Sequence, residues 1–206
     1  MFSGSTYFSR IRSTFAKFKL RLGKRIPSPK TDGSIPFSLI QDPETALSIG
    51  ELRAIGRVTV QTAALELDLI RFLSTLLFGN PDIGVSVFLG LNLKSLIDML
   101  PHAFRLKVKT ESYDDDIMSL VSALEKLAAE RNTIVHGQWH YDVTEHRVLK
   151  TKARKTKRAK REQLYFVQTE KASAHQLNEI ADLIVLARKV LVAFYQKLLS
   201  NKLVAT

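Results

Sequence analysis

The sequence predicts an all-α protein, a four-helix up-and-down bundle with a small β-ribbon inserted between the last two helices. Apolar residues recur every three or four positions over four long segments, which is the periodicity of helices with one buried face. Capping residues, prolines and glycines separate these segments. Only two short stretches, residues 146–149 and 164–167 in an insertion at about 140–168, have strand character. With 206 residues and 45% hydrophobic content, the chain is long enough for one sizeable core. We therefore expect one helical domain over residues 42–206.

The N-terminal segment, residues 1–41, precedes this domain. Its first 30 residues hold eight basic and no acidic side chains. Its apolar residues recur at helical spacing: Phe8, Ile11, Phe15, Phe18 and Leu22. A basic amphipathic helix of this kind suits an anionic membrane surface, RNA phosphates or an organellar presequence. The alternative is a tail that docks its phenylalanines on the body. Prolines and a glycine predict a linker up to residue 41.

The first helix of the domain is predicted from Asp42 to about Phe78. Asp42, Pro43 and Glu44 supply a capping side chain, a proline at the first position and a carboxylate in the first turn. The predicted apolar face of this helix consists of Leu52, Ile55, Thr59, Thr62, Leu65, Leu69, Phe72 and Leu76.

The second and third helices carry similar start and stop signs. Asn80 and Pro81 predict the start of the second helix, which Pro101 ends. The third begins near Ser112, where three aspartates favour the positive end of the helix dipole, and Gly137 is placed to terminate it. Its apolar ridge is Ile117, Leu120, Val121, Leu124, Leu127 and Ala128.

The fourth helix, starting near Ser173, has the most regular pattern of all. Its stripe is Leu177, Ile180, Ile184, Ala187, Leu191, Phe194 and Leu198. Between the third and fourth helices, residues 146–149 and 164–167 have strand character, and this predicts a ribbon with a basic tip. The basic residues, which we call the basic run and expect to bind RNA, are Lys150, Lys152, Arg154, Lys155, Lys157, Arg158, Lys160 and Arg161. The alternative for this run is a solvated loop.

The formal net charge of +11 is unevenly distributed. Outside residues 1–30 and the basic run, 15 basic residues are outnumbered by 20 acidic ones. RNA or an anionic membrane would therefore meet the two basic segments first. No stretch is apolar enough to span a membrane. We expect a cytoplasmic protein, with association to a membrane through residues 1–30 as the alternative.

Candidate ligands for a metal are few. The chain has no cysteine, so thiolate zinc sites and cysteine nucleophiles are excluded. His102, His140, His146 and His175 lack the spacing of a metal site. We expect neither a metal nor another cofactor.

The third helix places an arginine where its pattern calls for an apolar residue. Arg131 lies seven residues after Leu124 and so continues the apolar ridge. A guanidinium there needs an acceptor, because an unpaired buried charge is very costly. The acceptor is either a carboxylate, such as Glu66 or Asp68 of the first helix, or an anion that enters from outside.

Two further polar residues accompany Arg131. Asn132 and His136 are four residues apart and therefore neighbours on one side of the helix. An arginine can hold a phosphate at two points, and a histidine can move protons near neutral pH, which together suit cleavage of an RNA phosphodiester. The alternative is structural, with Arg131 paired to a carboxylate and His136 at a helix end. Trp139 and Tyr141 either stack on a base or, as is more common, pack under the ribbon.

The stretch Glu130-Arg131-Asn132-Thr133-Ile134-Val135-His136-Gly137 resembles the signature of the HEPN superfamily. In that signature an arginine, a polar residue and, a few residues later, a histidine close a bundle helix. Arg131, Asn132 and His136 match its three key positions, and the resemblance covers about residues 43–200.

The resemblance implies a metal-independent endoribonuclease in a toxin–antitoxin or phage-defence setting. Two subunits would place their arginines and histidines around one composite site, and an antitoxin or regulatory protein is a further partner. Arg131 would stabilise the phosphate, His136 would act as acid or base, and Asn132 would orient them. A non-catalytic HEPN-like module that binds RNA or a partner, with residues 1–30 on RNA or a membrane, is the alternative.

Overall fold

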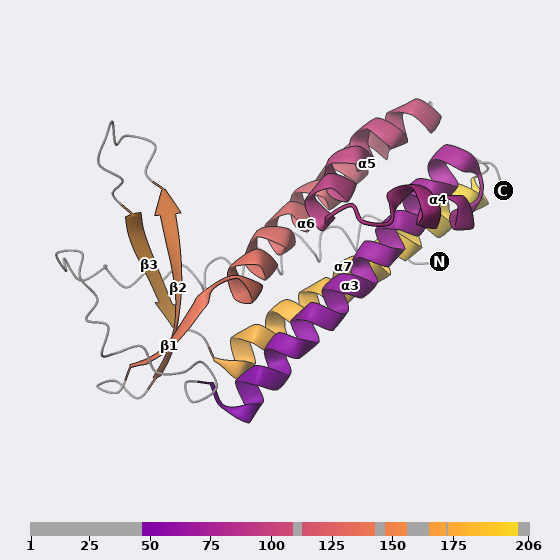
Figure 1. Ribbon diagram of the computed structural model, residues 1–206. Helices are drawn as coiled ribbons and strands as arrows, with labels where there is room; N and C mark the ends of the chain where they lie inside the picture. Colours follow the sequence, from indigo (N-terminus) through magenta and orange to yellow (C-terminus); the bar gives the residue numbers. More distant parts are fainter. Residues whose placement is uncertain (1–46, 109–112, 143–146, 156–164, 172, 202–206) are drawn as a thin grey trace.

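The computed structural model describes residues 47–108, 113–142, 147–155, 165–171 and 173–201. These residues form five helices and a small sheet (Figure 1). The helices are α3 (Ile49–Phe78), α4 (Pro81–Phe88), α5 (Leu93–Lys107), α6 (Asp114–Val135) and α7 (Ala174–Ser200). The all-α prediction for the body is confirmed. The described part of the chain holds five helices rather than the predicted four.

The two long helices α3 and α7 pack side by side and run in the same direction (Figure 1). Arg57 near the start of α3 forms an ion pair with Asp182 of α7, and Asp68, further along α3, forms one with Arg188. At the end of the pair, the rings of Phe72 and Phe194 lie 6.2 Å apart. Residue numbers therefore increase in the same direction along both helices, so α3 and α7 are parallel.

Helix α6 runs opposite to these two. Its first turn lies at the end of α7, where Asp116 is 3.9 Å from Lys197 and the Tyr113 hydroxyl accepts a hydrogen bond from Asn201. Helix α5 is antiparallel to α6, since Lys94 near its start reaches Glu125 in the second half of α6. Hydrogen bonds to Asp98 and to Glu125 raise the pKa of Lys94. The simple up-and-down order that we predicted has no such parallel pair of first and last helices.

The predicted second helix is in fact two helices. Asn80 caps α4 as expected, its side chain accepting a hydrogen bond from the Asp82 N–H at 2.8 Å. The chain then leaves the helix at Leu89 and passes through Gly90, whose φ of 95° is left-handed. Asn92 caps the new helix α5. Pro101 lies inside α5 and does not end it, so burial of that helix outweighs the backbone hydrogen bond that proline removes.

Helix α3 begins later than predicted. Ser48 and Glu51 form a capping box, in which the Ser48 hydroxyl accepts from the Glu51 N–H and the Glu51 carboxylate accepts from the Ser48 N–H. Asp42, Pro43 and the whole segment 1–41 lie outside the described residues. The buried face of α3 also differs from the prediction, because Leu52 and Thr59 are exposed whereas Ala54 and Val58 are buried.

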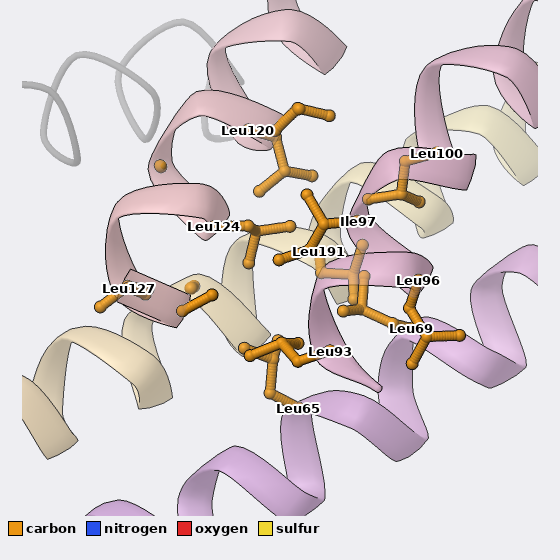
Figure 2. Close-up of a cluster of buried hydrophobic side chains, with 14 of the residues drawn as sticks. Leu65, Leu69, Leu93, Leu96, Ile97, Leu100, Leu120, Leu124, Leu127 and Leu191 are labelled. Carbon is orange, nitrogen blue, oxygen red and sulfur yellow. The ribbon is translucent and has the colours of Figure 1, made fainter. Parts of the chain in front are cut away.

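The core lies where α3, α5, α6 and α7 meet. In Figure 2, Leu65 and Leu69 of α3 point toward side chains of the other three helices, among them Leu93, Leu124 and Leu191. Every residue of the predicted ridge of α6 and of the predicted stripe of α7 is buried. The 3.6-residue periodicity of these two helices therefore predicted their buried faces correctly.

A three-stranded antiparallel sheet follows α6, where a ribbon was predicted. Its strands are β1 (Gln138–Asp142), β2 (Arg147–Lys155) and β3 (Tyr165–Lys171), in the order β1-β2-β3. In the register, Trp139 of β1 pairs with Lys150 of β2. Within the described residues no helix is both long and apolar enough to cross a membrane.

The close approach of α4 to α3 gives a test of the fold. A Cβ added at Gly84 would lie 1.9 Å from the Oγ of Ser74 and 2.3 Å from its Cβ. We expect Gly84→Ala to lower the free energy of unfolding by about 1 to 3 kcal/mol, because the helices must move apart. The measurement is urea unfolding followed by circular dichroism.

The matched control is Gly56→Ala in α3. Nothing lies within 4 Å of a Cβ at Gly56. This change should leave stability equal or raise it by up to about 1 kcal/mol, because alanine favours the helix. Equal stability of the Gly84→Ala variant and the wild type would contradict the α3–α4 packing.

Candidate anion-binding site

Helix α6 ends beside the sheet, and its last turn carries the residues singled out in the sequence. The helix stops at Val135, and the N–H of His136 caps it by donating to the Asn132 carbonyl at 3.0 Å. Gly137 follows this C-cap directly, so the helix ends where the sequence predicted. Because α6 is antiparallel to α3 and α7, this end of α6 lies toward the starts of those two helices (Figure 1).

The side chains of Arg131, Asn132 and His136 come together in this last turn, and we call them the α6 site. The Arg131 Nη1 donates to the Asn132 Oδ1 at 3.0 Å and lies 3.4 Å from the His136 Nε2. A hydrogen bond between guanidinium and imidazole requires that Nε2 carry no proton, because a guanidinium can only donate. Asn132 thus contacts Arg131 through its side chain and His136 through its backbone.

Arg131 is half-buried, and its charge is not neutralised by the rest of the described chain. Its Nε is buried and has no hydrogen-bond partner. Its two hydrogen-bonding neighbours, an amide and an imidazole, carry no negative charge. No carboxylate of the described residues lies within 4 Å of the guanidinium.

The carboxylates that we considered as partners of Arg131 are engaged elsewhere or out of reach. Asp68 accepts a hydrogen bond at 2.7 Å from the Nε of Arg188, whose Nη1 also donates to Gln61. Asp68 is thus the counterion of Arg188 of α7, and it does not serve as the acceptor of Arg131 that the sequence left open as one alternative. Glu66 forms no ion pair with Arg131 either. A charged donor group that is half-buried and unneutralised is a place where an anion binds favourably.

Trp139 holds the end of α6 in place. Its indole N–H donates to the Ile134 carbonyl at 3.2 Å, and its ring packs against the core. The last carbonyls of a helix have no partner within the helix, so this bond satisfies one of them. Of the two interpretations of Trp139, the structure favours packing over base stacking. Tyr141 belongs to β1, and its side chain is not among the described ones.

The basic run is only partly within the described chain. Residues 150–155 are part of strand β2, which pairs with the strand that follows the α6 site. The remaining members, Lys157, Arg158, Lys160 and Arg161, lie outside the described residues. The structure therefore brings Arg131, Asn132 and His136 together and leaves the contacts of the basic run as a prediction.

Histidine and carboxylate side chains do not gather into a metal site in the described ranges. They contain no group of three or more residues that could hold a metal ion. His102 is exposed on α5, and His175 lies 3.6 Å from Glu179 on α7. His140 and His146 belong to parts of the chain whose side chains are not described.

Comparisons of this chain with family models, curated proteins and solved structures return no match. The function of the chain is therefore inferred from the geometry of the α6 site and from the motif that Arg131, Asn132 and His136 form.

The bond from Trp139 to helix α6 can be tested by substitution. Trp139→Phe keeps an aromatic ring and removes the N–H, so the Ile134 carbonyl loses its partner. We expect a loss of about 1 kcal/mol in the free energy of unfolding, as for a typical hydrogen bond. Trp139→Leu removes ring area as well and should cost more. If Trp139→Phe unfolds at the same urea concentration as the wild type, the indole does not support the helix end.

Proposed function

We propose that this chain is a HEPN-like helical protein that binds RNA at the α6 site and cleaves it without a metal. The observation that carries the proposal is the half-buried Arg131 guanidinium, which contacts an imidazole and an amide and has no carboxylate partner among the described residues. A phosphodiester supplies the missing negative charge. It also supplies oxygens in the geometry that a guanidinium binds best.

The proposed role of Arg131 is to hold the scissile phosphate. Its guanidinium is fixed on one side by Asn132, so its orientation costs little conformational entropy when an anion binds. The charge on the phosphate increases in the transition state of transesterification. A preoriented cation stabilises that state more than the bound ground state, and this difference accelerates the reaction.

His136 is the proposed general base. When the phosphate of a bound RNA replaces the imidazole as acceptor of the Arg131 Nη1 hydrogen bond, the Nε2 of His136 is free to take the proton of the 2′-hydroxyl. The 2′-oxygen then attacks the neighbouring phosphorus while the bond to the 5′-oxygen breaks. The products are a 2′,3′-cyclic phosphate and a 5′-hydroxyl, whose proton comes from the imidazolium or from solvent. His136 is exposed at the end of α6, which gives a strand of RNA access to its ring.

RNA is favoured over a small anion by the neighbouring sheet. Strand β2 holds the first members of the basic run and pairs with β1, which begins two residues after His136. An RNA strand bound at the α6 site could therefore place its neighbouring phosphates on basic residues that are close to this site in sequence. The proposal includes action in the cytoplasm on RNA. It also includes a homodimer in which two α6 sites form one composite site, and control by an antitoxin, as the HEPN resemblance implies.

The test is RNA cleavage by the purified full chain in the presence of EDTA. We expect Arg131→Ala and His136→Ala each to reduce the cleavage rate at least about 100-fold. The matched controls are Arg105→Ala and His102→Ala, which change the same residue types at exposed positions of α5. Cleavage that persists at the wild-type rate in both α6-site variants would show that these residues are not catalytic.

The alternative is an RNA-binding module that does not cleave, and strand β2 is the feature that favours it. In that case RNA binding is expected to weaken steeply with salt, and no cleavage products appear under any condition. The variant in which alanine replaces Lys157, Arg158, Lys160 and Arg161 should have an RNA association constant that depends less on salt. The plot of log association constant against log salt concentration should become less steep by about 0.7 for each phosphate that the variant no longer binds. An unchanged slope would remove these residues from the RNA-binding surface.

A further inference from the structure

Helix α3 carries a second apolar stripe on the side away from the core. Its residues recur at spacings of three and four, and we call them the outer stripe: Ile49, Leu52, Gly56, Val60, Ala63 and Leu67. All of them are exposed, with Ile49 68%, Val60 64% and Leu52 47% accessible. Nothing lies within 4 Å of a Cβ built at Gly56. The helix therefore has two apolar faces, of which the core uses only one.

The fold itself covers the far end of the same stripe. The next residues on this side of α3 after Leu67 are Ile70, three residues later, and Ser74, four residues after that. Both are buried. Helix α4 lies over this part, with Gly84 against Ser74. No described element covers the stripe from Ile49 to Leu67, a length of about 27 Å along the helix. An uncovered apolar surface of this length on a folded body indicates a binding surface.

The exposed charges on α3 itself are positive. The exposed charged residues of α3 are all arginines, namely Arg53, Arg57 and Arg71. Arg57 pairs with Asp182, whereas Arg53 and Arg71 pair with none of the described residues. The acidic residues of α3 are less exposed than these arginines. Glu51 is buried in the capping box, Asp68 is bound to Arg188, and Glu66 is half-buried.

We propose that the outer stripe lies on an anionic membrane surface. Its aliphatic side chains enter the boundary between headgroups and acyl chains, while Arg53 and Arg71 extend to the lipid phosphates at its flank. The segment of eight basic and no acidic residues ends at residue 30, fewer than 20 residues before Ile49. In sequence, this segment therefore adds positive charge within 20 residues of the first residue of the stripe.

A second copy of the chain fits this surface less well. Two α3 helices packed through their outer stripes would bring the arginines of both copies to one interface. Glu51 is held in the capping box and Asp68 is bound to Arg188, so Glu66, which is half-buried, is the one carboxylate of α3 left to neutralise them. An anionic lipid surface supplies that negative charge at every position along the stripe.

The orientation that follows leaves the α6 site uncovered. Leu65 and Leu69, on the opposite face of α3, point toward the core that includes α6 (Figure 2). A membrane on the outer stripe therefore lies on the far side of α3 from Arg131 and His136. Membrane binding by this face is thus independent of the proposed ribonuclease activity.

The experiment is cosedimentation of the full chain with vesicles of phosphatidylcholine containing phosphatidylserine, and with vesicles of phosphatidylcholine alone. We expect binding to the anionic vesicles only. The double variant Leu52→Glu with Val60→Glu should bind at least about tenfold more weakly. It loses two aliphatic side chains that enter the membrane, and it places two negative charges against an anionic surface. Arg53→Glu with Arg71→Glu should also bind more weakly and show a smaller dependence on salt.

The matched control is Leu106→Glu with Val192→Glu, which puts the same charges at exposed aliphatic positions on α5 and α7, 67% and 44% accessible. It should bind as the wild type does, and circular dichroism should show every variant folded. Failure of the wild type to bind anionic vesicles would overturn the proposal. Equal binding of the α3 variants and the wild type would overturn it too, since residues 1–30 alone would then hold the membrane. A dimer that Leu52→Glu with Val60→Glu dissociates, without effect on vesicles, would assign the stripe to a second copy.

Discussion

The parallel packing of α3 against α7 is the constraint on which the rest of the structure depends. These two helices are the longest of the described chain, and their shared core faces include Leu65, Leu69 and Leu191. Parallel neighbours cannot be joined by a short turn, so the chain between them must return to the starting end. Helix α6 makes that return. Its direction is thereby set, and its last turn, with Arg131 and His136, is placed near the starts of α3 and α7.

The polar contacts between α3 and α7 also determine the electrostatics of the α6 site. Asp68 is half-buried on α3 and is bound by Arg188 of α7 through Nε, while the Nη1 of the same guanidinium binds Gln61. Two donors of one guanidinium are therefore used between these helices. That pairing removes a carboxylate that the sequence alone offered as a partner of Arg131. Because Asp68 neutralises Arg188, it is not a counterion of Arg131, which has no carboxylate partner among the described residues.

The sequence predicted best where one rule governs many residues. The ridge of α6 and the stripe of α7 follow the helical period without interruption, and every predicted residue is buried. The cluster of Arg131 with Asn132 and His136 was predictable for the same reason, because spacing on a helix determines which side chains are neighbours. Ser48 with Glu51 is a capping box that the sequence does contain, but the proline after Asp42 suggested an earlier start.

The failures have in common that a single residue or a tertiary contact decides them. Gly90 divides the predicted second helix by taking a left-handed conformation, and Pro101 stays inside α5 because tertiary burial compensates for its missing N–H. The bond from Trp139 to the Ile134 carbonyl joins two residues that no periodic pattern connects. The direction of α7 relative to α3 depends on the path of the whole chain, which local patterns do not contain.

Helix α3 shows why its buried face was predicted wrongly and what that error means physically. In a helix with one apolar face, the periodicity identifies the buried residues directly. Helix α3 has apolar residues on two opposite faces, and Leu52, which was predicted to be in the core, belongs to the outer stripe. The stability of the fold accounts only for the apolar residues on the buried face, because exposed aliphatic side chains contribute little to the stability of the isolated body. A net charge averaged over the body is negative, yet the exposed charges beside the outer stripe are arginines. The local pairing of apolar surface with unpaired positive charge, rather than the average charge of the body, therefore determines which partner this face of the protein can bind.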